Sequence, residues 1–246
     1  MENFFVNKFF LTAAEVNAQL EMPMGGLVTT IIDTATAHAN ALNVGYSKLM
    51  ETNSSWVLSR LSITLNGVPT VNHNYELTTW VENLNRLYSE RDFRLDSADD
   101  GSTLGWVNSV WMAIDMDTRR PVDLTALNQL REVVNDEPFL GEKVGKLMPF
   151  KDAVSSYDYQ FRVSDIDVNR HVTTRRYIDL LMDLWPLEHF EEYRVSRFEI
   201  AFKHEAHYGE IATIEMAEPQ DDGSCEAQLR VGDAVCAIAR ISFEKR

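Results

Sequence analysis

Two segments far apart in the chain show the same alternation of apolar and polar positions. The first covers residues 57–65 (VLSRLSITL) and the second covers residues 194–202 (RVSRFEIAF). A period of two is typical of a strand that buries one face. Because the two segments also share residue types, they indicate an internal repeat in the chain.

Similar features follow each segment in the same order. Strand-like runs lie at 75–82 and 210–217, and further strands are expected at about 106–115 and 235–244. Between them lie two Asp-Asp-Gly turns, at 99–101 and 221–223, which we expect to be equivalent. A strand at 157–163 is expected to open the second half.

One helix is expected ahead of the alternating segment in each half. The first, at about 26–49, is rich in alanine. The second, at about 174–185, has an apolar face made of Tyr177, Leu180, Leu181 and Leu184. Pro186 is expected to end it. A long helix wrapped by a curved antiparallel sheet is a hotdog fold, so the sequence predicts an α+β protein of two tandem hotdogs. The alternative is two unrelated α+β domains.

The expected domain boundaries follow from a segment rich in residues that interrupt helices and strands. It carries Pro138, Gly141, Gly145 and Pro149, a composition typical of a linker. We therefore expect an N-terminal hotdog at 1–134, a linker at 135–152 and a C-terminal hotdog at 153–246.

Composition narrows the classes of partner. The chain has 246 residues, of which 38 are acidic and 23 basic, giving a net charge of −15. Such a charge disfavours binding to nucleic acid or to an anionic membrane. No apolar run is long enough for a membrane span, and the first residues lack the pattern of a signal peptide. With Cys225 and Cys236 expected as reduced thiols, we expect a cytoplasmic protein.

A polar cluster lies just ahead of the second predicted helix. Asp167, Asn169 and His171 alternate with other residues, so in an extended loop their side chains would point the same way. Thr173 or Thr174 can cap the helix, whose first amides would lie beside the cluster and could hold an oxyanion. The alternative is ordinary turn chemistry around Asp167.

The repeat makes this cluster asymmetric. Aligning Ser59 with Ser196 places Val68 opposite Glu205, and residues 22–26, ahead of the first helix, contain no Asp-x-Asn-x-His. A structural repeat does not require such a difference between its copies. A single active site in the second half would explain it.

Residues 165–172 (DIDVNRHV), followed by Arg176-Tyr177-Ile178, strongly resemble the acyl–acyl carrier protein thioesterases. Further matches in the family's order cover most of the chain; they are Thr79-Trp80-Val81, Arg91-Asp92-Phe93, Ser109-Val110-Trp111-Met112, Thr118-Arg119-Arg120-Pro121 and residues 198–205. The sequence departs from the family at Ala206, where plant members often have cysteine, and at Thr173-Thr174, which replace a pair of asparagines.

The resemblance implies a fatty acyl–acyl carrier protein hydrolase with catalytic Asp167, Asn169, His171 and Glu205. Glu205 is expected to act as general base or nucleophile, and Asn169 to polarise the thioester carbonyl. His171 would orient water or relay a proton, and Asp167 would hold both neighbours or share the role of base with Glu205. The acyl chain is expected in the first hotdog, near residues 27–49 and 56–65. No cofactor is expected.

The carrier protein is itself acidic, whereas basic residues surround the cluster in sequence. Carrier-binding candidates are Arg170, Arg175, Arg176 and Lys203, with Arg194 and Arg197 nearby. A homodimer is also considered. The preferred chain length and the oligomeric state do not follow from the sequence.

Other functions stay open at this point. They are an acyl-CoA thioesterase, a hydroxyacyl dehydratase on the same fold, and a non-catalytic acyl-binding module. A metal site at His204, Glu205 and His207 is disfavoured, because the spacing lacks the His-Glu-x-x-His pattern.

Overall fold

Ten antiparallel strands form one continuous sheet in the computed structural model, which describes residues 4–246. The first-half strands are β1 (Phe5–Phe10), β2 (Ser54–Leu65), β3 (Asn74–Leu84), β4 (Ser89–Ser97) and β5 (Thr103–Asp115). The second-half strands are β6 (Ser155–Gln160), β7 (Tyr193–Phe202), β8 (Ile211–Met216), β9 (Cys225–Val231) and β10 (Ala234–Lys245). The helices are α1 (Met24–Ala41), α2 (Tyr46–Met50), α3 (Asn128–Glu132), α4 (Thr174–Met182) and α5 (Leu187–Glu192).

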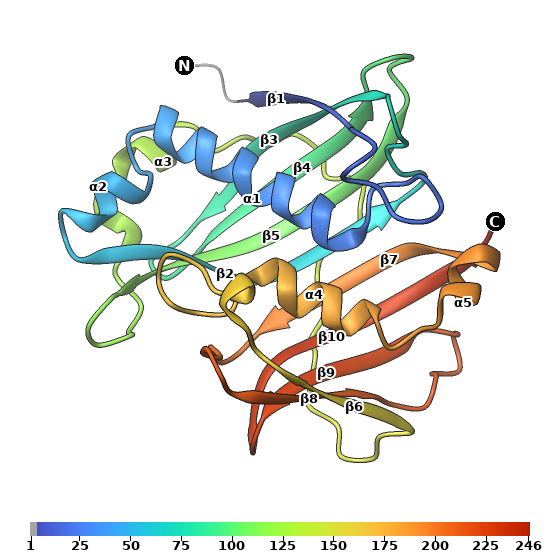
Figure 1. The fold of residues 1–246 in the computed structure, drawn as a ribbon. Helices are drawn as coiled ribbons and strands as arrows, with labels where there is room; N and C mark the ends of the chain where they lie inside the picture. Colours follow the sequence, from blue (N-terminus) through green and yellow to red (C-terminus); the bar gives the residue numbers. More distant parts are fainter. Residues whose placement is uncertain (1–3) are drawn as a thin grey trace.

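The strand order repeats on the two sides of the sheet. It runs β1-β3-β4-β5-β2-β7-β10-β9-β8-β6, so each half has the same sequence of strands outward from the β2–β7 seam. The helices α1 and α4 lie side by side over one face of the sheet, each across the strands of its own half (Figure 1). This arrangement confirms the predicted tandem hotdog fold.

The seam lies on the pseudo-twofold axis. The alignment of Ser59 with Ser196 also makes Ser62 the counterpart of Glu199, and these two residues are register partners between β2 and β7. A residue that faces its own counterpart must lie beside the axis that relates the two copies. Both side chains are buried on the face of the sheet that the connecting segment crosses. There the Ser62 hydroxyl donates to the Glu142 carbonyl, and Gly145 N donates to Glu199 Oε1 at 2.7 Å.

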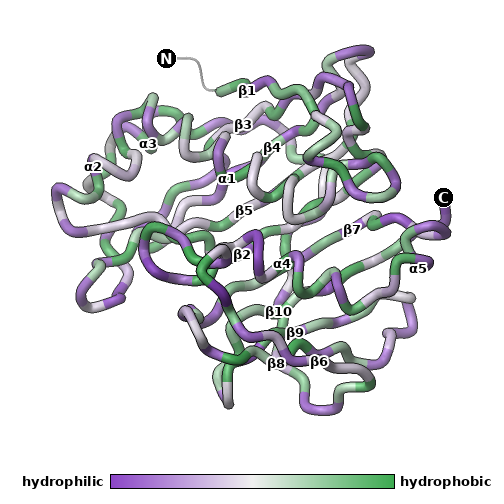
Figure 2. The backbone as a smooth tube through the Cα atoms, in the orientation of Figure 1, coloured by the Kyte–Doolittle hydropathy of each residue, from purple (hydrophilic) through white to green (hydrophobic). Residues whose placement is uncertain are grey.

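The core fills the space between the helices and the sheet. Leu27, Val28, Ile31 and Ala35 of α1 are buried in one cluster that continues through Leu180 of α4. Hydrophobic stretches run along the second-half strands, and polar ones gather in the connecting loops (Figure 2). Within the described part of the chain, no helix combines the length and apolar character needed to cross a bilayer.

The predicted helix boundaries were wrong in both halves. The segment expected as one helix at 26–49 is divided, because Asn43 takes a left-handed conformation (φ 56°) between α1 and α2. Asparagine tolerates this conformation better than most residues. In the second half α4 ends at Met182, ahead of Pro186, and that proline instead lies at the N-cap position of α5.

The equivalence of the two Asp-Asp-Gly turns was also wrong. Residues 99–101 connect β4 to β5, whereas residues 221–223 connect β8 to β9, the counterparts of β3 and β4. Gly101 and Gly223 both have positive φ, at 75° and 80°. The shared letters therefore reflect the local need of a tight turn for glycine rather than a common position in the repeat.

Candidate active site

The loop at 167–171 is a tight turn organised by the side chain of Asp167. Its Oδ1 accepts hydrogen bonds from Asn169 N (2.8 Å) and His171 N (3.1 Å), while Asp167 N donates to the His171 carbonyl at 2.8 Å. Arg170 completes the turn in a left-handed conformation (φ 65°). The turn leads into α4, where the Thr173 hydroxyl caps the helix by accepting from Arg176 N.

Glu205 reaches this loop from the end of β7. His171 Nε2 lies 3.4 Å from Glu205 Oε2, and Val172 N donates to the Ala206 carbonyl at 2.9 Å. The Tyr177 hydroxyl accepts from Ala206 N at 2.8 Å, which ties the strand end to α4. Burial raises the pKa of Tyr177 well above its ordinary value, so the hydroxyl stays neutral.

All four predicted catalytic residues line one cleft of about 700 Å³ between the two halves. Asp167, Asn169, His171 and Glu205 form one side, and residues of β2 and β5 form the other. Trp56 and Trp111 belong to this opposite side. The cleft can therefore bring a carboxylate, an imidazole and an amide to one bound molecule, beside an apolar wall.

Sequence reasoning missed one charged residue of the cleft. The Arg119 guanidinium contacts Glu205 Oε1, the carboxylate oxygen that does not face His171. Arg119 lies in the turn after β5, in the first half, at a left-handed position (φ 58°). Arg119 belongs to Thr118-Arg119-Arg120-Pro121, one of the segments that resemble the family, and this resemblance could have drawn attention to it. No pattern in the sequence connects it to Glu205.

The first half contains a counterpart of the 167–171 turn, at a different place from the one expected. Asn17 Oδ1 accepts from Gln19 N and Glu21 N, both at 3.0 Å, and Asn17 N donates to the Glu21 carbonyl at 2.8 Å. Leu20 has φ 61°, as Arg170 has φ 65°. Residues 22–26, which the sequence analysis compared with the 167–171 turn, are therefore not its counterpart. The true counterpart is Asn-x-Gln-x-Glu at 17–21.

This counterpart separates two properties of Asp167. Because Asn17 makes the same backbone hydrogen bonds, those bonds are turn chemistry, as the alternative interpretation held. The differences between the copies are the side chains that the turn presents. His171 stands where the first half has Glu21, and Glu205 stands where it has Val68.

The four predicted carrier-binding residues divide into two groups. Arg170 is exposed on the 167–171 turn, and Lys203 lines the cleft. Arg175 lines a different cleft, next to Asp179, which lies 3.4 Å away. Arg176 is engaged internally, since its Nε lies 2.6 Å from the buried Asp165 carboxylate and its guanidinium lies over the Tyr159 ring.

No cluster suited to a metal ion occurs among residues 4–246. Groups of three or more histidine, cysteine, aspartate or glutamate side chains with that geometry are absent there. His171 and His207 do approach, with ring centroids 5.2 Å apart at 68°, but as an edge-to-face aromatic contact.

The fold and the cleft together define a double-hotdog protein with a carboxylate–histidine site between its halves. Comparison with known proteins gives the family: the acyl-ACP thioesterase N-terminal domain matches residues 2–128, and the C-terminal domain matches residues 150–245. The chain belongs to the acyl-ACP thioesterase family, which confirms the resemblance seen in the sequence.

Solved structures share the fold of this chain. The chain is 29% identical to an acyl-ACP thioesterase from Bacteroides thetaiotaomicron, with a TM-score of 0.90 over 98% of each chain. A 12:0-ACP thioesterase from Umbellularia californica has the same fold, with a TM-score of 0.89 at 17% identity over 100% of this chain and 99% of that one.

Curated plant relatives are longer than this chain. The palmitoyl-acyl carrier protein thioesterase of Gossypium hirsutum is 24% identical over 94% of this chain and 59% of its own length. The Arabidopsis thaliana enzyme of the same description is 26% identical over 82% of this chain and 52% of its own length. The chain thus spans a little more than half of these relatives.

We predict that Asp167→Asn preserves the fold and that Asp167→Ala weakens it. Asparagine can accept both backbone hydrogen bonds, as Asn17 does, so the free energy of unfolding should change by less than about 0.5 kcal/mol. Alanine leaves two amides without their acceptor and should cost about 1–3 kcal/mol. Urea denaturation of both variants measures this. Equal losses for the two variants would contradict the structural role given to the turn.

Proposed function

We propose that this protein hydrolyses fatty acyl–acyl carrier protein to a free fatty acid and the holo-carrier. One observation carries the proposal: Glu205 and His171 meet at 3.4 Å in a cleft whose opposite wall also borders an apolar pocket. A thioester held in the cleft would have a base beside its carbonyl and an apolar wall along which its chain could lie. Membership of the family favours this function over a dehydratase or a non-catalytic acyl-binding module.

The chemistry follows from the groups on the cleft. The Glu205 carboxylate takes a proton from water while the water oxygen adds to the thioester carbon. Asn169 and the first amides of α4 stabilise the oxyanion that forms. The tetrahedral intermediate then expels the thiolate as the C–S bond breaks. The proton passes from Glu205 through His171 to the sulfur, which leaves the carboxylate ready for the next cycle.

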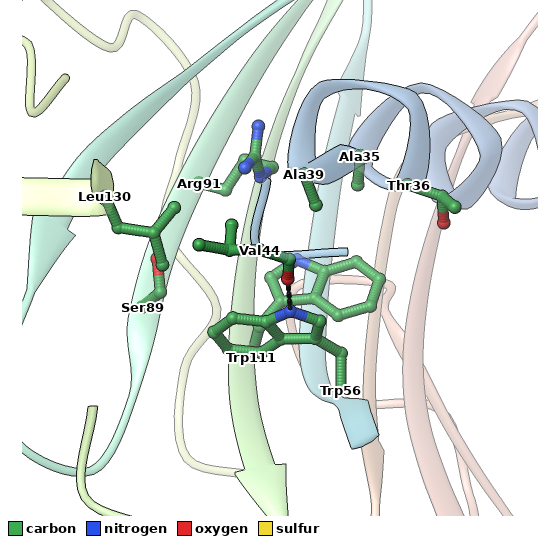
Figure 3. A pocket seen from close by; sticks show the side chains of 9 residues that line it. All are labelled: Ala35, Thr36, Ala39, Val44, Trp56, Ser89, Arg91, Trp111 and Leu130. Atoms are coloured by element: carbon green, nitrogen blue, oxygen red, sulfur yellow. Dashed lines mark hydrogen bonds between the residues drawn. The ribbon is translucent and has the colours of Figure 1, made fainter. Parts of the chain in front are cut away.

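The acyl chain would run along the apolar wall of the cleft, and its end would reach a small cavity of about 40 Å³ in the first half. Figure 3 shows Ala35 and Ala39 of α1 facing this pocket, with Trp56 and Trp111 across from them. The Trp56 indole donates to the Val44 carbonyl at 2.8 Å, so its orientation is fixed. Both tryptophans also border the catalytic cleft, and the chain would pass beside them.

The same region of the second half is filled. His189 and Phe190 of α5 pack against Phe243 of β10, with ring centroids 4.5 Å and 6.2 Å apart. Phe243 is the counterpart of Trp111, because each pairs with an equivalent residue of its seam strand, Val195 and Leu58. Aromatic rings thus occupy the space that small alanines leave open in the first half.

These features support a division of labour between the halves. We propose that residues 1–134, of which 1–3 lie outside the described structure, hold the acyl chain. Residues 135–152 connect the halves, and residues 153–246 supply the four proposed catalytic side chains. A cytoplasmic location and a homodimer stay predictions.

The carrier protein would dock at the mouth of the cleft. Arg170 and Lys203 have no ion-pair partner among the described residues, in a chain with a net charge of −15. Val168, two positions before Arg170, is 89% exposed. A local basic and apolar surface of this kind is complementary to an acidic carrier. Arg175 and Arg176, engaged elsewhere, are omitted from this surface.

We predict that Glu205→Gln lowers kcat for acyl–acyl carrier protein by roughly 100-fold or more, since an amide cannot accept the proton from water. Glu188→Gln, an exposed change on α5, is the matched control and should be neutral. Thiol release measures the rate. Wild-type turnover by Glu205→Gln would contradict the proposed mechanism.

We predict that Ala39→Phe shifts the preference toward shorter acyl chains. A ring at this position would fill the pocket, so kcat/KM for a palmitoyl substrate should fall at least about tenfold relative to a decanoyl substrate. Ala41→Phe, at an exposed position of the same helix, should leave the ratio unchanged. An unchanged ratio for Ala39→Phe would place the chain elsewhere.

We predict that the double change Arg170→Glu and Lys203→Glu raises KM for acyl–acyl carrier protein by about tenfold, through repulsion of the acidic carrier. KM for a short thioester without a carrier should stay within a factor of about two. Arg175→Glu, on the other cleft, serves as the comparison and should change neither. An equal rise with both substrates would argue against docking at this surface.

A further inference from the structure

We propose that Arg119 is a positioning residue that holds the Glu205 carboxylate in line with His171. The proposal rests on the hydrolase function above and adds a residue of the first half to a site otherwise built from the second. Arg119 contacts one carboxylate oxygen of Glu205, and His171 faces the other. The two contacts together define the direction of the carboxylate.

Glu205 has little else to hold its side chain. The residue follows the end of β7, and its side chain is 38% exposed. Within residues 4–246, Arg119 and His171 are its charged partners, and no backbone amide donates to it. A solvent-exposed carboxylate with one weak contact would sample several rotamers. The Arg119 contact restricts the rotamers of Glu205 before substrate binds. A carboxylate that is already oriented loses less conformational entropy on reaching the reactive geometry.

Arg119 is itself held by a built turn. Asp115 Oδ1 accepts from Thr118 N at 2.7 Å and from the Thr118 hydroxyl at 2.8 Å, and Arg119 N donates to the Asp115 carbonyl at 2.9 Å. These hydrogen bonds, chiefly from Thr118 N, hold the pKa of Asp115 below its usual range. The turn keeps Arg119 at positive φ, which costs of order 1 kcal/mol and persists only where the surroundings enforce it.

The second cleft of the molecule shows what this pair adds. There Arg246 binds Glu21 with both its terminal nitrogens at 2.7 Å, and Glu21 is the counterpart of His171. Arg246 therefore pairs with the residue that the turn presents, and the strand residue opposite is the apolar Val68. In the catalytic cleft the arginine instead binds the strand carboxylate and leaves His171 facing the second oxygen. Each cleft has a Glu–Arg pair across the halves, but only the catalytic arrangement leaves an imidazole beside the acid.

The first test separates positioning from substrate binding. Arg119→Gln should lower kcat by about 100-fold, the size expected for a misplaced catalytic group, with KM changed less than about threefold. Arg119→Lys, which restores one charged donor, should recover about tenfold of that loss. Arg120→Gln, at the exposed neighbouring position, is the matched control and should keep wild-type kinetics. A rise in KM at constant kcat would overturn the positioning role.

The second test asks whether Arg119 acts through Glu205. In the Glu205→Gln background, Arg119→Gln should lower kcat by less than about threefold, because its target is already lost. Fully multiplicative effects would overturn the proposal, since damage to folding would multiply in this way.

The same cycle is measured with a carrier-free acyl thioester, so that the two proposals can fail separately. Hydrolysis of that thioester but not of the carrier substrate would refute the proposed function. The comparison of the single and double variants of Arg119 and Glu205 would then still test the positioning role of Arg119. Hydrolysis of neither substrate by the parent protein would overturn both.

Discussion

The pairing of β2 with β7 is the constraint on which the rest of the molecule depends. It joins the two halves in a fixed register from Arg60–Ala201 to Thr64–Arg197 and makes one sheet of two. Because the strands are antiparallel, the end of β7 arrives beside the beginning of β2 and the turn after β5. Glu205 and Arg119, 86 positions apart, meet for that reason alone. The connecting segment is fastened across the same seam through Glu199, so a shift of register would break buried hydrogen bonds as well as the site.

Against this symmetric frame, function arises from few substitutions. The turns at 17–21 and 167–171 share backbone bonds and φ values, so the repeat preserves the geometry that presents a side chain to each cleft. What differs is the side chain presented and the strand residue opposite. The clefts they serve differ accordingly. One holds an acid and an imidazole beside an open pocket, whereas the other holds a salt bridge to the last residue of the chain.

The sequence predicted most of this through patterns that act locally. The alternation at 57–65 and 194–202 identified the seam strands themselves, and aligning them singled out Glu205 as a carboxylate with no acidic counterpart. Three of the features that were not predicted have no local pattern that encodes them. The break at Asn43 depends on one backbone conformation, and the contact of Arg119 depends on the register of distant strands. The turn at 17–21 has the same hydrogen bonds as the turn at 167–171 but different residue types. Asparagine replaces aspartate there because only an acceptor oxygen is required.

Small side chains on α1 leave space above the sheet in the first half, and the buried Arg91 of β4 spans part of that space. Its guanidinium, which is buried, lies 2.6 Å from His38 Nδ1 on α1 and 3.3 Å from the Thr79 hydroxyl. Burial lowers the pKa of Arg91 to about 10 and that of His38 to about 3, so at neutral pH a charged donor meets a neutral acceptor. The strand pairings make buried Cys225 the counterpart of Arg91 in the second half. Burying a cation without a carboxylate partner is costly, and a core selected for stability alone would replace it, as the second half does. The first half instead keeps this polar contact between strand and helix, and it lies at the side of the pocket that Ala35 and Ala39 also line.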